Sequence, residues 1–123
     1  MLVNCSNHPN EWWSEKQRRE AVRQWGEITD VPFPNVDPYL TEAEVHQLAE
    51  QMKTEILALH PAAVMCQGEF TLCHALTSDL LRKGVPVVAA CSQRCVHEVC
   101  GEDGITRRIS EFEFVQFRKY QEA

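Results

Sequence analysis

The chain has 123 residues, 44% hydrophobic and 24% charged, which is ordinary for a soluble protein and enough for a single domain over residues 1–123. No apolar run approaches the roughly 20 residues of a membrane span, and the first residues lack the features of a signal peptide. We therefore expect a cytosolic protein with no membrane partner. The net charge of −6 argues against long DNA or RNA, because such binding requires neutralised phosphates, but it permits a small anionic ligand.

Strand-like and helix-like segments alternate along most of the chain. Two capping-box patterns, Ser14 with Gln17 and Thr41 with Glu44, mark the starts of helices. Strands are expected at residues 2–5, 27–33, 62–66 and 85–91, and helices over about 12 residues from Ser14, from Thr41 to near His60, and over about 70–83. This alternation predicts an α/β fold with a Rossmann-like, mainly parallel sheet.

The pattern changes after the fourth strand. Residues 95–99 and 105–117 flank a Gly-Glu-Asp-Gly turn and predict a C-terminal β-hairpin, for a total of about six strands and three helices. Phe112 and Phe114 are expected on one face of the second arm, and Ile109, Val115 and Phe117 on the other, unless a bulge shifts the alternation. Apolar residues on both faces suggest that one covers the core and the other a partner chain.

Three short apolar runs each stop at a small polar cluster. These clusters are residues 6–9, 67–69 and 92–94, and they follow the first, third and fourth expected strands. The carboxyl ends of parallel strands lie at one edge of a sheet, where ligands bind. The sequence therefore predicts a site at this edge.

The first cluster, Ser6-Asn7-His8-Pro9, occupies the usual phosphate-contacting loop of such sheets. No G-x-G-x-x-G and no P-loop motif is present, which excludes ordinary dinucleotide and P-loop nucleotide binding. Asn7 can hydrogen-bond a base, ribose or phosphate, and His8 can act as an acid or base near neutral pH. The alternative is that Ser6 and Asn7 only form the turn.

The other two clusters offer anion contacts. Gln67, Gly68, Glu69 and Thr71 lie where a strand leads into a helix N-terminus, whose free N–H groups favour an anion. Ser92 and Arg94 end the fourth strand, and arginine is a good bidentate partner for phosphate. The alternatives are a simple helix start and a surface arginine paired with Glu98. The nearby Trp12-Trp13 pair can stack on bases or staple the following helix.

Six cysteines raise the question of a metal site. Cys91, Cys95, His97 and Cys100 have the spacing C-x3-C-x-H-x2-C, without the C-x2-C pair of common zinc knuckles, and strand alternation would split them between two faces. We therefore expect free thiols, no metal and no cofactor.

The order of these segments resembles the small CRISPR-associated proteins with a CARF-like, Rossmann-type fold, which include the stand-alone ring nucleases of type III systems. The resemblance covers nearly the full length of the chain. It is carried by Asn4–Pro9, Gly68-Glu69, Leu81–Gly84, Ser92-x-Arg94 with Glu98, and Phe112-x-Phe114-x-x-Phe117-Arg118-x-Tyr120. Cys91 and Cys95 depart from it, because Thr or Ser is expected there.

The resemblance implies a homodimer whose two rims face each other and hold a cyclic oligoadenylate, with cyclic tetra-adenylate as the first candidate, across the twofold axis. It implies metal-independent cleavage by the ribose 2′-hydroxyl, which would switch off an antiviral second messenger. In that chemistry Arg94 would stabilise the phosphorane, His8 would carry the proton, and Asn7, Ser6 and Ser92 would orient ribose and phosphate. Gly68 and Glu69 would hold another phosphate through their N–H groups.

Two other functions stay open. One is a sensor or sponge that binds the same ligand without cleaving it. The other is an unrelated Rossmann-like protein whose hairpin docks a protein partner.

Overall fold

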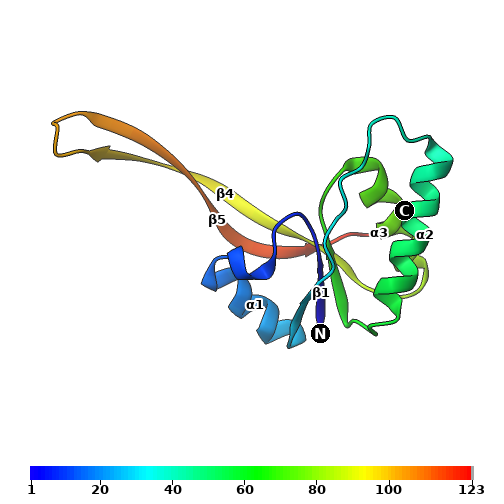
Figure 1. The fold of residues 1–123 in the computed structure, drawn as a ribbon. Helices are drawn as coiled ribbons and strands as arrows, with labels where there is room; N and C mark the ends of the chain where they lie inside the picture. The colour runs from blue at the N-terminus through cyan, green and yellow to red at the C-terminus, as the bar shows by residue number, and fades with distance from the viewer. Residues whose placement is uncertain (123) are drawn as a thin grey trace.

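A computed structural model describes residues 1–122 as a mixed α/β fold built on one five-stranded sheet (Figure 1). The strand order is β2-β1-β3-β4-β5, in which β1 to β4 run parallel and β5 is antiparallel to β4. The strands are β1 Leu2–Cys5, β2 Ile28–Asp30, β3 Ala63–Cys66, β4 Val87–Cys100 and β5 Thr106–Lys119. The α/β class and the C-terminal hairpin expected from the sequence are therefore confirmed.

Helices cover both faces of the sheet. Helix α1 (Glu15–Trp25), with a short 3-10 turn η1 (Asn10–Trp12) before it, packs on one face, while α2 (Glu42–Leu57) and α3 (Phe70–Arg82) pack together on the other (Figure 1). The strands β1 and β3 are buried along their whole length, as central parallel strands should be. Both capping-box bonds between Thr41 and Glu44 are present, so α2 begins where the sequence predicts.

The expected count of six strands is wrong, because the fourth strand and the first arm of the hairpin are one continuous 14-residue strand, β4. Only its first residues pair with β3, through Val64 with Val87 and Met65 with Val88. The rest pairs with β5 alone. We call residues 92–114 the arm, and Figure 1 shows it extending away from the helices.

A β-bulge in β5 corrects the expected side-chain alternation. Cys91 pairs with Gln116 and Ser92 with Phe114, so Val115 has no partner in β4. The extra residue turns Phe117 onto the same face as Phe114, and their ring centroids lie 4.9 Å apart. Phe117 also packs edge-on against Trp25 of α1, at 5.2 Å. The bulge is the exception that the sequence left open, and it places Phe114 and Phe117 on the same face in place of the regular alternation.

No helix within residues 1–122 is both long enough and apolar enough to cross a membrane.

Candidate functional site

A cavity of about 620 Å³ lies on the α1 side of the sheet, beside the carboxyl ends of β1 and β3. Six of the nine residues that the sequence placed in a site line it together: Ser6, Asn7, His8, Gln67, Gly68 and Ser92. Its other walls come from η1 and α1 (Trp12, Trp13, Ser14, Gln17) and from the strands (Met65, Ala90, Phe112, Phe114).

The loop after β1 is held by Asn4, a polar side chain only 1% exposed within the first strand. Its Nδ2 donates to the His8 carbonyl at 2.8 Å and to Asp30 Oδ1 at 2.9 Å. Its Oδ1 accepts from Ser6 Oγ at 2.7 Å. The Ser6 hydroxyl proton is therefore used inside the protein, which makes Ser6 a support of the loop rather than a donor to a ligand.

Asp30, at the end of β2, ties two further groups to this loop. Its Oδ1 accepts from Asn10 Nδ2 at 3.0 Å and from the Asn10 backbone N–H at 3.2 Å. Burial alone would raise the pKa of Asp30, but the bonds from Asn10 and Asn4 outweigh it and hold the pKa below its ordinary value. Asn4 and Asp30 were missed at the sequence level, although an asparagine inside an apolar strand is a usable signal.

The backbone of His8 is fixed while its ring is free. Its carbonyl accepts from Asn4 and, at 3.3 Å, from Trp13 Nε1. Trp13 is buried, and its ring lies 6.2 Å from that of Phe117 in β5, so it packs onto the sheet beside α1. The imidazole of His8 is exposed and lies 6.4 Å from the ring of Trp12.

Two aromatic side chains in the cavity wall are open to solvent. Trp12 is 70% exposed and Phe112 is 77% exposed, although both are large and apolar. Nothing in residues 1–122 covers them. The sequence left both stacking on a base and stapling the helix open for Trp12, and it did not place Phe112 in the site.

Gln67 joins three strands at the floor of the site. Its backbone N–H donates to the Cys5 carbonyl at 3.1 Å, and its Oε1 accepts from the Ala90 N–H at 2.7 Å. The second bond fixes the amide plane, so the Nε2 group stays available as a donor.

Gly68 has a packing role. A Cβ at this position would lie 2.5 Å from the ring carbons of Phe33, far inside van der Waals contact. The Phe33 backbone N–H donates to the Ser6 carbonyl at 3.2 Å, so the ring is anchored where it touches Gly68. Glycine therefore lets the segment after β2 close under the site.

Glu69 and Thr71 do not line this cavity, because they form the N-cap of α3. The Glu69 carboxylate accepts from the backbone N–H groups of Thr71, at 2.9 Å, and Leu72, at 2.8 Å. Those backbone bonds, with a further bond from the Thr71 hydroxyl, lower the pKa of Glu69. A carboxylate thus occupies the helix N-terminus where the sequence suggested a phosphate, and both residues face a separate cavity beside α2.

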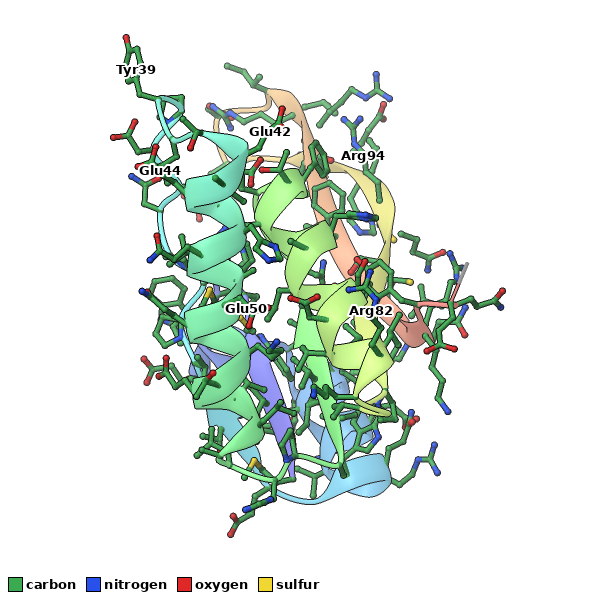
Figure 2. All side chains as sticks on the ribbon, turned by 90° about the vertical axis from the view of Figure 1, so that its right-hand side faces the viewer. Tyr39, Glu42, Glu44, Glu50, Arg82 and Arg94 are labelled. Atoms are coloured by element: carbon green, nitrogen blue, oxygen red, sulfur yellow. The ribbon has the colours of Figure 1, made fainter. Side chains whose placement is uncertain are left out.

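Arg94 also lies outside the cavity lining. The strand β4 continues past the sheet edge and carries Arg94 onto the arm, opposite Phe112. Its Nε donates to Ser110 Oγ at 2.6 Å. In Figure 2, Arg94 lies beside the strands of the arm, apart from α2 with its Glu42 and Glu44. Arg94 is therefore not among the residues that line the cavity, and its contact with a phosphate stays a prediction.

Within residues 1–122, no three side chains of His, Cys, Asp or Glu gather closely enough to hold a metal ion.

A family model described as "Uncharacterized protein MJ1673 family" matches residues 1–118. The chain belongs to this family. No curated protein and no solved structure matches it. The residues that match the family model include those that line the cavity and the whole arm.

The contact between Gly68 and Phe33 generates the first prediction. Gly68→Ala should lower the free energy of unfolding by about 1 to 3 kcal/mol, because the new methyl group displaces an anchored ring. Urea denaturation measures it. Gly101→Ala is the control, since the close contacts of its Cβ are with the ends of the Asp103 and Arg107 side chains, at 2.8 and 2.9 Å, and the nearest backbone atom, the Ile105 oxygen, is at an ordinary 3.6 Å. Equal losses in the two variants would contradict the packing role.

The lowered pKa of Asp30 generates the second prediction. The Asp30 carboxylate binds a proton more weakly in the native state than in the unfolded chain, because its folded pKa lies below the value of about 3.9 for an unfolded Asp. The stabilisation by Asp30 is therefore complete above about pH 4 and disappears as the pH falls through the folded pKa. The difference in unfolding free energy between wild type and Asp30→Asn should narrow on acidification. A difference that stays constant with pH would show that Asp30 is not held ionised by this network.

Proposed function

We propose that the cavity binds a cyclic oligoadenylate, with cyclic tetra-adenylate as the first candidate, in a homodimer. The observation that carries the proposal is the pair of exposed aromatic rings, Trp12 and Phe112, in the same cavity as amide and imidazole groups. Nucleobases stack on such rings. A ring that serves this purpose is exposed to solvent when no ligand is bound. The resemblance to the CARF-like ring nucleases supports adenine as the base.

The remaining polar groups suit the rest of a nucleotide. Asn7 and His8 are exposed on the rigid loop after β1, and Gln67 has a free Nε2 group at the floor. Ser92 adds a hydroxyl at the start of the arm. Together these groups can donate to the edge of a base, a ribose hydroxyl or a phosphate oxygen.

Cleavage would be an internal transesterification. The ribose 2′-oxygen attacks the adjacent phosphorus, the bond from phosphorus to the 5′-oxygen breaks, and the products are a 2′,3′-cyclic phosphate and a 5′-hydroxyl. The proton moves from the 2′-oxygen to the 5′-oxygen, so no water or redox partner is consumed. His8 is the side chain in the cavity suited to carry that proton. Such cleavage would remove the second messenger of a type III CRISPR response.

One observation favours the alternative function, that of a sensor or sponge that binds the ligand without cleaving it. Among residues 1–122, no lysine or arginine lines the cavity. Cleavage at phosphorus relies on charge stabilisation, and neutral amides supply less of it than a guanidinium. Incubation with labelled cyclic tetra-adenylate separates the candidates: a linear product supports the nuclease, binding without product supports the sensor, and no binding refutes both.

Trp12→Ala should weaken binding of cyclic tetra-adenylate roughly 5- to 150-fold, the equivalent of about 1 to 3 kcal/mol for one stacked base. Trp12→Phe should recover most of the loss. The control is Tyr39→Ala, because Tyr39 is 92% exposed, does not line the cavity and lies in the segment just before α2 (Figure 2). If Tyr39→Ala weakened binding as much as Trp12→Ala, the assignment of Trp12 to the binding site would be contradicted.

His8→Ala should leave affinity within about threefold and reduce single-turnover cleavage by at least about 100-fold, the usual contribution of a general acid or base. The matched control is His46→Ala on α2, which should cleave normally. Full cleavage by His8→Ala would assign the proton transfer to another group.

A further inference from the structure

The arm is a two-stranded ribbon with solvent on both faces. Two strands without a third strand or a helix behind them are only marginally stable in water. Apolar side chains nevertheless lie open on both faces: Phe112 (77% exposed) and Val96 (45%) on one, Ile109 (41%) and Val99 (45%) on the other, and Ile105 (55%) in the turn at the tip. An exposed, apolar, unpartnered ribbon of this kind points to a surface that another chain covers.

One face of the arm continues the wall of the cavity, and we call it the cavity face. The cross-strand pairs Ser92 with Phe114 and Arg94 with Phe112 lie on it, nearest the sheet. Farther out, the same face carries the pairs Val96 with Ser110, Glu98 with Arg108, and Cys100 with Thr106.

This face is self-complementary about its middle pair, Val96 with Ser110. Arg94 precedes Val96 by two residues and Glu98 follows it by two. On the other strand, Phe112 and Arg108 flank Ser110 in the same way. A twofold axis along this pair would therefore set Arg94 against the partner's Glu98, and Phe112 against the partner's Arg108.

The charges on this face are free to make such contacts. Within residues 1–122, none of Arg94, Glu98 and Arg108 has an ion-pair partner within 4.0 Å. Arg94 uses only its Nε, towards Ser110, which leaves both terminal nitrogens of the guanidinium without a protein partner there.

We propose that two copies of this chain pack their arms antiparallel, cavity face to cavity face, about the Val96–Ser110 pair. The Cys100–Thr106 pair of each arm then lies over Ser92 and Phe114 of the other copy. The tip of the partner's arm would thus cover the open side of the cavity, which is incomplete in one chain.

The arrangement has a consequence for the ligand. The two cavities lie at opposite ends of the paired arms, so each takes its own ligand, whereas the resemblance implies one ring on the twofold axis. The inference shares the homodimer with the proposed function, and only this last consequence rests on the cavity binding its ligand.

The test is the oligomeric state of the full chain without ligand, by light scattering and sedimentation. Wild type should be a dimer, and Arg94→Glu and Glu98→Arg should each weaken dimerisation at least about tenfold. The double variant, with the charges exchanged, should recover it. Circular dichroism checks that each variant is folded.

Glu111→Arg is the matched control, because Glu111 pairs with Cys95 on the opposite face and undergoes the same change of charge. It should dimerise as wild type does. A monomeric wild type, a double variant that stays dissociated, or an equal effect of Glu111→Arg would each overturn the proposal. No ligand is present in these measurements, so they test the pairing of the arms and not the binding of cyclic oligoadenylate, which the incubation with labelled ligand tests separately.

Discussion

The buried amide of Asn4 is the contact on which the shape of the site depends. A polar side chain inside a central strand is costly unless all its hydrogen-bonding groups are paired. Here the partners are the His8 carbonyl and Ser6, both in the loop after β1, and Asp30 at the end of β2. Satisfying one amide therefore fixes the loop after β1, the end of β2 and the position from which His8 faces the cavity.

Local patterns in the sequence were sufficient for the fold class and for most of the site. Apolar strands, helix caps and polar clusters at strand ends act over a few residues, so they placed Ser6, Asn7, His8, Gln67, Gly68 and Ser92 at one edge. The features that were missed depend on contacts between distant residues. Asn4 and Asp30 are 26 residues apart in the sequence. The ring of Phe33 leaves no room for a Cβ at Gly68, which lies in a different segment. Likewise, Glu69 was read as a phosphate neighbour because its capping bonds are visible only once α3 is in place.

The continuity of β4 changes the meaning of its charged residues. A strand that stopped at the sheet edge would leave Arg94 at the rim of the cavity. The strand instead runs on to Cys100, supported only by β5, so Arg94 becomes part of a ribbon with a regular pattern of apolar and charged side chains. No lysine or arginine within residues 1–122 lines the cavity, whose exposed aromatic rings suit the proposed recognition of bases, and the charges of the arm are those that the proposed dimer would use.

The central claim is that a nucleobase stacks on Trp12. The chain has three tryptophans: Trp12, exposed on the cavity wall; Trp13, buried in the same wall with its N–H bonded to the His8 carbonyl; and Trp25, packed against Phe117 outside the cavity lining. Proton–nitrogen correlation spectra, assigned with Trp12→Phe, follow all three during addition of cyclic tetra-adenylate. The account predicts a large, saturable shift of the Trp12 signal and little change at Trp25. An unchanged Trp12 signal, or equal shifts of all three, would contradict it.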